Sequence, residues 1–238
     1  MNQWDTLTDI FGCRWDEAEV PACAADNICI AWPSMLSGIV RAFPEKAALS
    51  VLDFGCGGGL FCRCLHGLGH TVTGYDRSEE LVKVAQGNVP PEVLVTSNRT
   101  VIEGAAKYDL ITSIMVLPFI EDLHGVLGTL AGLVKDNGVI IQAVFHPEFV
   151  MDNFKTNRLV TDFSSETNSG FLELEKGVKI PVHIRSESEY RQAYARYGLA
   201  EIYRDSPPFS QEFLAKYQMP FSTRYPEYLI QAFSRRPA

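Results

Sequence analysis

The sequence predicts an α/β fold with a mostly parallel sheet and helices on both faces of that sheet. Three observations predict it: short apolar runs alternate with helical patterns, the first run ends in a glycine-rich turn, and two strand-like runs lie near the C-terminus. Strands that alternate with helices need crossover connections, which make consecutive strands parallel. The early strands are expected at residues 48–54, 70–76, 92–96, 108–115 and 139–145.

Helices are expected between these strands because start and stop signals bracket the intervening segments. Ser78 precedes a segment that opens with acidic residues, and Gly87-Asn88 follows it, as at many helix starts and ends. Asp136-Asn137-Gly138 ends another such segment. The helices are expected at residues 60–68, 79–86 and 122–134.

The pattern changes after residue 145. Residues 146–185 carry little helical pattern and contain one expected hairpin, which turns at Lys176-Gly177. Later elements complete a seven-stranded sheet, with a helix at 186–197 and strands at 199–204 and 227–233.

We expect one domain, because no linker-like stretch divides the chain. The insertion after the fifth strand is a natural lid, since loops on a rigid scaffold often carry specificity. The expected parts are an N-terminal helical cap at 1–45, a core at 46–145, the lid insertion at 146–185 and a C-terminal part of the sheet at 186–238.

Composition narrows the function classes. The net charge is -8 and 46% of the residues are hydrophobic, so neither nucleic acid nor an anionic membrane is an expected partner. No apolar run reaches the roughly 18 residues that cross a bilayer, and the N-terminus lacks a secretory signal pattern. The six cysteines lack the paired spacing of a zinc site. We expect no metal, reduced thiols, a cytoplasmic location and a monomer or homodimer.

The glycine-rich turn marks a ligand site at the carboxyl edge of the sheet. The segment VLDFGCGGG ends a buried strand with Asp53 and continues through Gly55, Gly57 and Gly59 into a helix. Glycines let the backbone turn tightly and approach a ligand, and the helix N-terminus adds oriented N–H groups. In open α/β sheets, ligands bind beyond the carboxyl ends of the strands.

Two acids indicate which ligand binds there. A dinucleotide site with the GxGxxG pattern would need a third glycine at position 60, where Leu60 stands. Asp53 would repel a pyrophosphate but suits an ammonium group. Asp76 ends the second strand, where a carboxylate accepts hydrogen bonds from ribose hydroxyls. An ammonium and a ribose together describe S-adenosylmethionine better than NAD.

These segments carry a family resemblance. VLDFGCGGG and TVTGYDRSEELVKVAQ resemble the first two motifs of class I methyltransferases, and YDLITSIMVLPFIED resembles the fourth. The chain is similar to the small-molecule branch that includes the ubiquinone and menaquinone biosynthesis enzymes. The resemblance implies a Rossmann-like methyltransferase fold and methyl transfer from S-adenosylmethionine to a small molecule, in secondary or specialised metabolism.

The resemblance also implies roles for particular residues. Gly55 and Gly57 would contact the methionine part of the cofactor, and Asp53 would lie near its ammonium. At the other end, Asn98 stands where family members often carry an acid near the adenine. The expected cofactor-binding residues are Asp53, Gly55, Gly57, Asp76, Arg77, Asn98 and Ser113.

The acceptor side is predicted from chemistry and position. His146 follows the fifth strand, and a histidine there can take a proton from an acceptor hydroxyl or amine; the alternative is a turn residue before Pro147. Glu148 is a weaker candidate. Methyl transfer from a sulfonium can also proceed by alignment of the acceptor alone. The expected substrate-binding residues are Trp32, Met35, Phe119 and Phe149.

Other functions remain open at this point. A dehydrogenase is disfavoured by Leu60, whereas a non-catalytic S-adenosylmethionine-binding protein and a protein or RNA methyltransferase both share the fold. The segment DSPPF at 205–209 resembles a motif of nucleic-acid amino-methyltransferases. That motif follows the fourth strand in those enzymes, so here we expect a loop.

Overall fold

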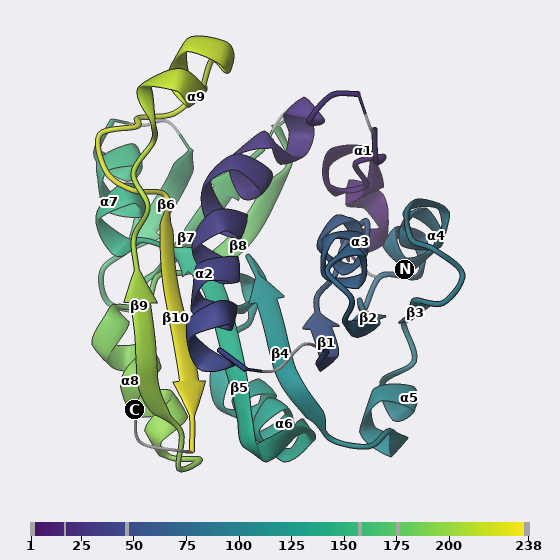
Figure 1. Ribbon diagram of the computed structural model, residues 1–238. Helices are drawn as coiled ribbons and strands as arrows, with labels where there is room; N and C mark the ends of the chain where they lie inside the picture. The colour runs from purple at the N-terminus through teal and green to yellow at the C-terminus, as the bar shows by residue number, and fades with distance from the viewer. Residues whose placement is uncertain (1–2, 17, 46–47, 157–158, 175–176, 236–238) are drawn as a thin grey trace.

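The protein folds around a seven-stranded sheet, seen in a computed structural model that describes residues 3–16, 18–45, 48–156, 159–174 and 177–235 (Figure 1). The strand order is β3-β2-β1-β4-β5-β10-β9, and β10 is antiparallel to both of its neighbours. This confirms the predicted mostly parallel α/β fold. The strands are β1 (Ser50–Phe54), β2 (Thr71–Tyr75), β3 (Leu94–Thr96), β4 (Tyr108–Ile114), β5 (Val134–Phe145), β9 (Ala200–Asp205) and β10 (Tyr228–Ser234).

Helices cover both faces of this sheet (Figure 1). On one face, α2 and α3 bury apolar side chains against the strands. On the other face, α6 and α8 pack against each other and against the sheet. The helices are α2 (Trp32–Ala42), α3 (Leu60–Gly67), α4 (Glu79–Asn88), α5 (Arg99–Gly104), α6 (Leu123–Leu133) and α8 (Glu187–Ala195).

The caps of these helices explain why they begin where they do. The Ser78 hydroxyl accepts a hydrogen bond from the Leu81 N–H at 3.2 Å and so caps α4, as its position predicted. Ser186 and Glu189 form a reciprocal capping box at the start of α8. Such caps satisfy N–H groups that have no partner within the helix.

Strand β10 joins β9 to the rest of the sheet, because it pairs with β5 on one side and β9 on the other. Its first residue, Tyr228, pairs with Phe145, the last residue of β5, so the start of β10 lies at the carboxyl edge. Within this pairing the Gln231 Oε1 atom accepts a hydrogen bond from the Gln142 side-chain amide at 3.0 Å. Tyr194 of α8 donates to Gln142 at 2.9 Å. Buried polar side chains that satisfy one another in this way specify the register of the two strands.

The segment between β5 and α8 differs from the expectation of little helix. It contains α7 (Pro147–Lys155) and a three-stranded antiparallel sheet of β6 (Val160–Ser164), β7 (Ser169–Glu173) and β8 (Lys179–His183). The hairpin is present as β7 and β8, although Lys176 of its expected turn lies outside the described residues. Helix α7 was missed because its signals are short: a histidine cap, then a proline at its first position.

The N-terminal region is helical, as expected for 1–45, with residues 1–2 and 17 outside the described part. It contains η1 (Gln3–Leu7), α1 (Thr8–Phe11), η2 (Ala22–Ala24) and the π-helix η3 (Asn27–Ala31) before α2. Helix α2 packs on β5, β9 and β10. At Gly38 the helix approaches so closely that an added Cβ would lie 2.9 Å from the Tyr203 ring of β9. Helix α9 (Gln211–Lys216) lies between β9 and β10 in the chain.

The expectation of reduced thiols is wrong for two of the six cysteines. The structure joins Cys13 to Cys23 in a disulfide, with Cα atoms 6.2 Å apart. The chain folds back between α1 and η2, and this brings together two cysteines whose spacing gave no signal. Cys29, Cys56, Cys62 and Cys64 are free. In the part of the chain that the structure describes, no helix is both long and apolar enough to cross a membrane.

Candidate cofactor and acceptor site

The glycine loop after β1 depends on backbone conformations that favour glycine. Gly55, Gly57 and Gly59 have φ values of 78°, 51° and 77°, in the left-handed region where other residues are strained. The Val116 side chain also leaves no room for a Cβ on Gly55. The N–H groups of Gly55 and Cys56 both donate to the Tyr75 carbonyl, at 2.7 and 2.9 Å. The loop is therefore tied to the end of β2.

Asp76 lies directly after β2 and joins the glycine loop to α4. Its Oδ2 accepts a hydrogen bond from the Gly57 N–H, and its Oδ1 accepts one from the Ser78 N–H, both at 2.9 Å. Burial raises the pKa of this carboxyl, while these two N–H groups lower it. The structure thus brings together Asp76 and Gly57, two of the residues that we expect to bind the cofactor.

Asp53 lies beneath the loop and is only 3% exposed. Its Oδ1 accepts from the Thr112 hydroxyl at 2.8 Å, and its Oδ2 accepts from the Cys62 thiol at 3.3 Å. Burial raises its pKa to about 6, and the charge of Asp76 adds to the increase. The Asp53 carboxyl therefore supports the loop from within, with both oxygens already accepting hydrogen bonds.

An N-terminal segment lies over the glycine loop. The carbonyl oxygens of Cys13 and Gly58 both accept from the Asn88 side-chain amide, at 2.8 and 2.7 Å. The backbone N–H of Trp15 donates to Asn88 Oδ1 at 3.0 Å. A second contact joins Ser78, whose hydroxyl donates to Asp5 of η1 at 2.7 Å. Asn88 is thus the link that positions residues 13–15 against the loop.

The other three expected cofactor residues have different surroundings. Arg77 is exposed beside Asp76. Asn98 caps α5, since its Oδ1 accepts from the Thr100 N–H at 3.0 Å. Ser113 is 1% exposed on β4, and no hydrogen-bond partner for its hydroxyl is found among the described residues.

His146 and Glu227 meet where β5 and β10 reach the carboxyl edge. The His146 N–H donates to the Glu227 carbonyl at 2.7 Å. The His146 ring caps α7, because its Nδ1 accepts from the Glu148 N–H at 3.3 Å. Burial lowers the pKa of His146. Its ring therefore has a structural role at this position, which the alternative of a turn residue before Pro147 anticipated.

Comparison with known proteins decides the family. A family model described as "Methyltransferase domain" matches residues 32–203. The chain belongs to this methyltransferase family. Membership confirms the predicted enzyme class and, with it, S-adenosylmethionine as the cofactor.

Individual relatives of this methyltransferase agree with the family match. It is 31% identical over 111 residues to a ubiquinone biosynthesis O-methyltransferase of Methylobacterium nodulans, a match that covers 44% of each chain. The chain therefore spans about half or less of the length of the curated relatives that it matches.

Solved structures share the fold. An S-adenosylmethionine-dependent methyltransferase from Mesorhizobium loti is 21% identical, with a TM-score of 0.64 over 88% of this chain and 97% of that one. The CcbJ methyltransferase of Streptomyces caelestis is 14% identical, with a TM-score of 0.62 over 96% and 95% of the two chains.

Aromatic side chains continue from the N-terminal segment of the methyltransferase to α7. The Trp4 ring lies 5.3 Å from Phe119, which lies 6.2 Å from Phe145. Phe145 in turn stacks on Phe149 at 6.1 Å. This row contains two of the expected substrate residues, Phe119 and Phe149. Trp32 and Met35 are instead buried between α2 and the sheet, with the Trp32 ring 5.0 Å from Phe61.

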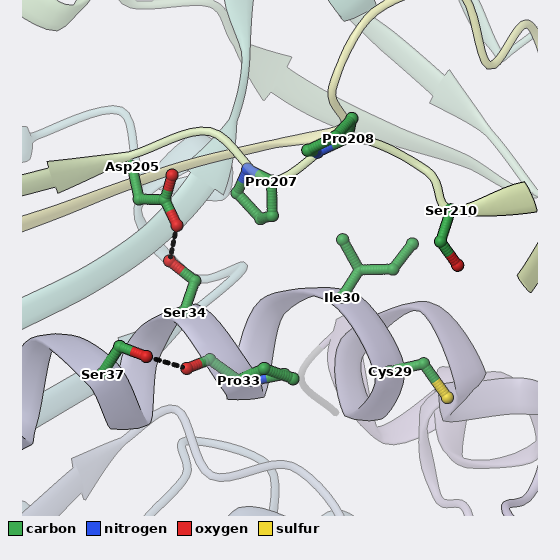
Figure 2. A pocket seen from close by; sticks show the side chains of 9 residues that line it. All are labelled: Cys29, Ile30, Pro33, Ser34, Ser37, Asp205, Pro207, Pro208 and Ser210. Atoms are coloured by element: carbon green, nitrogen blue, oxygen red, sulfur yellow. Dashed lines mark hydrogen bonds between the residues drawn. The ribbon is translucent and has the colours of Figure 1, made fainter.

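A groove of about 270 Å³ lies between α2 and the loop after β9. Figure 2 shows Asp205 and Ser34 facing each other across it, and the Ser34 hydroxyl donates to Asp205 at 2.6 Å. The DSPPF segment begins with Asp205 at the end of β9 and continues as the expected loop, which contributes to the wall. The lining residues are Cys29, Ile30, Pro33, Ser34, Ser37, Asp205, Pro207, Pro208 and Ser210.

Sequence reasoning missed several residues of this region. Asn88 was read only as a helix stop, whereas its side chain makes three of the contacts that cover the glycine loop. Glu227 and Asp26 were not singled out, although acids in otherwise apolar segments are a usable signal of a buried charge. Trp4 lies far from every motif in the sequence, and only the fold places it beside Phe119.

Proposed function

We propose that this methyltransferase transfers the methyl group of S-adenosylmethionine to a small-molecule acceptor. The observation that carries the proposal is the Asp76 carboxyl, bonded to the Gly57 N–H at the edge of the glycine loop. A buried acid in this position suits paired ribose hydroxyls. The names of the curated relatives, ubiquinone biosynthesis O-methyltransferases, favour a small acceptor.

The residues present fit this cofactor. Gly55 and Gly57 would bind its methionine part through backbone groups, and Asp76 its ribose. Asp53 would act on the ammonium from beneath the loop, and the Ser113 hydroxyl is a buried group that still needs a partner. Arg77 and Asn98 would lie toward the adenine. When bound, the cofactor supplies an electrophilic methyl group on a positively charged sulfur.

The acceptor is proposed to bind beside β5 and β10. The row of aromatic rings from Trp4 to Phe149 supports this, because large apolar side chains usually line small-molecule sites. Residues 146–185 would act as a lid, with Phe119, Phe149, Trp32 and Met35 shaping the enclosed space. We propose the cytoplasm as location, and secondary or specialised metabolism as context.

His146 is proposed to take a proton from the acceptor. Its lowered pKa keeps the ring neutral near pH 7, and its Nε2 is left to act because Nδ1 caps α7. Replacing His146 by Ala should lower kcat by roughly 10²–10⁴-fold with cofactor affinity unchanged. His146→Asn is the control, since Asn can keep the helix cap. If His146→Ala loses stability but keeps its turnover per folded molecule, His146 acts only as the cap of α7.

Titration with S-adenosylhomocysteine, the product form of the cofactor, tests the central proposal. Asp76→Ala should weaken binding by about tenfold or more, because charge-assisted hydrogen bonds contribute roughly 1.5–3 kcal/mol each. Asp136→Ala removes an exposed acid from β5 and should leave binding unchanged. Binding of NAD in place of the nucleoside, or an unchanged affinity in Asp76→Ala, would contradict the proposal.

A further inference from the structure

Two acids at the start of β10 are not used by the proposed cofactor site. Glu227 is 4% exposed, and Asp26, just before η3, is half-buried. The Tyr228 hydroxyl donates to Asp26 at 2.8 Å. The two carboxyls lie close enough for the charge of Asp26 to raise the pKa of Glu227. Together these side chains form an acidic cluster of Asp26, Glu227 and Tyr228 inside an apolar region.

The hydrogen bonding of the cluster is incomplete. Within the described part of the chain, Glu227 Oε2 is buried without a hydrogen-bond partner, and so is Oδ1 of the neighbouring Asn27. Both atoms are acceptors. Burial of an unpaired carboxyl costs several kcal/mol, and burial accordingly raises the pKa of both acids. Asp26 already accepts hydrogen bonds from Tyr228 and Asn27, so the acceptor that still needs a donor in this cluster is Glu227 Oε2.

The cluster also lies where an acceptor would be expected. Glu227 bonds through its carbonyl to His146, one residue beyond β5, at the same sheet edge as the glycine loop. In the strand order, β5 and β10 follow β1 and β4 on the side away from β2 and Asp76. An adenosine held at β2 therefore leaves the β5–β10 side for the molecule that receives the methyl group.

The groove of Figure 2 is lined in part by residues that follow Asp26 in η3 and α2. Its wall begins at Cys29, one helical turn after Asp26, and the charge of Asp26 helps to raise the pKa of the Cys29 thiol. Asp205 adds a carboxylate to the opposite wall. Lys216 and Glu212 of α9 also act on Cys29, with opposite signs. Asp26, Asp205 and Glu212 thus outnumber Lys216 around this groove, and the excess negative charge attracts cations.

We propose that Glu227, with Asp26 beside it, binds the ammonium group of the acceptor, so that the substrate of this methyltransferase is a small amine. The inference rests on the proposed function, because it assigns a substrate class to the same site. An ammonium brings the positive charge and the N–H donors that Glu227 Oε2 lacks. A neutral or anionic acceptor would leave this carboxyl unpaired.

Matched pairs of ligands test the proposal. With S-adenosylhomocysteine present in excess, calorimetry compares phenethylamine with 2-phenylethanol, tyramine with tyrosol, and tryptamine with tryptophol. We expect at least one amine to bind about tenfold or more tightly than its alcohol, since a paired buried charge is worth more than a neutral hydrogen bond. Glu227→Gln should remove most of this preference while the affinity for S-adenosylhomocysteine stays the same.

Two further variants complete the experiment. Glu92→Gln removes an exposed acid from the turn between α4 and β3, far from the cluster in the strand order, and should keep the preference for the amine. Asp26→Asn retains an acceptor for Tyr228 and should reduce the preference, which gives a second test if Glu227→Gln does not fold. Equal binding of every amine and its alcohol, or a preference that survives both Glu227→Gln and Asp26→Asn, would overturn the inference. Failure to bind S-adenosylhomocysteine would instead overturn the proposed function.

Discussion

Asp53 shows how the surroundings of a single residue change its pKa. It is held by Thr112 and Cys62, and its pKa is raised to about 6. The sequence predicted its place at the end of β1, because a strand ending in an acid before glycines is a local pattern. It did not predict these two partners, which come from β4 and α3 and meet Asp53 only through sheet pairing and helix packing.

The raised pKa of Asp53 predicts a pH-dependent stability. Its ordinary value is 3.8, so between about pH 4 and 6 the native state holds a proton that the unfolded state has lost. The free energy of unfolding therefore falls as the pH rises through this window, by about 3 kcal/mol at most. Asp53→Asn cannot titrate and should lose less stability over the same range.

Urea unfolding near pH 4 and again near pH 6.5 measures the difference between the two proteins. Acids that do not interact with Asp53 contribute equally to both proteins, so the difference reports the titration of Asp53 and its coupling to Asp76. Parallel changes in the wild type and Asp53→Asn would show that Asp53 titrates normally in the folded protein.

The sequence predicted the helices and strands that have strong local signals. Strands β1, β2, β4 and β5 and helices α3, α4 and α6 follow apolar runs, caps and glycine stops. Short elements were missed: α5, α7, α9 and β6 are stabilised mainly by the surfaces they cover. Helix α7 buries Phe149, Val150 and Asn153, and the surface that receives them comes from distant parts of the chain.

Replacing glycine by alanine should have opposite effects on stability at two helical positions, because only one of them lies in the close contact between α2 and β9. Gly38→Ala would place a Cβ 2.9 Å from the Tyr203 ring, whereas nothing lies within 4 Å of a Cβ on Gly132 in α6. We expect Gly38→Ala to destabilise the protein by about 1 kcal/mol or more through overpacking. Gly132→Ala should stabilise it by about 0.5 kcal/mol, because alanine favours helix. Denaturant unfolding of both variants measures the direction of each change in the free energy of unfolding. If both substitutions stabilise the protein, Gly38 does not lie as close to the Tyr203 ring as the structure shows.

The link between the N-terminal segment and the glycine loop is also testable. Asn88→Ala removes three hydrogen bonds and leaves buried backbone groups of Cys13, Trp15 and Gly58 without partners. We expect a loss of about 1–3 kcal/mol and faster hydrogen exchange at the Trp15 amide. Asn137→Ala, at an exposed position, is the control. Unchanged exchange at Trp15 would show that the segment is held by other contacts.

For the whole molecule, the alternation of strands and helices was enough to predict the sheet, because parallel strands need crossovers and only a few topologies allow them. The position of β10 between β5 and β9 is a long-range pairing that no local signal encodes. The proposed acceptor side likewise combines residues as distant in the sequence as Asp26 and Glu227. The candidate cofactor residues lie in local motifs that the sequence shows directly, whereas the proposed acceptor residues come together only in the fold.

Cofactor binding should stabilise the whole fold. S-adenosylhomocysteine at about 100 times its Kd should add about 2.7 kcal/mol to the free energy of unfolding. For a chain of this size, that corresponds to a rise in Tm of roughly 5–10 °C. NAD at the same concentration should leave Tm unchanged. A thermal melt that responds to NAD and not to S-adenosylhomocysteine would contradict the family's cofactor for this chain.

The antiparallel strand β10 has a consequence for synthesis on the ribosome. Strands β1 to β5 can pair as they emerge, since each finds a neighbour among them. Strand β9 emerges before β10 but pairs with β10 alone among the strands. Until residues 228–234 leave the exit tunnel, β5 therefore presents an unpaired edge and α8 lacks part of its docking surface. Unfinished chains therefore expose a strand edge that can pair with other nascent chains.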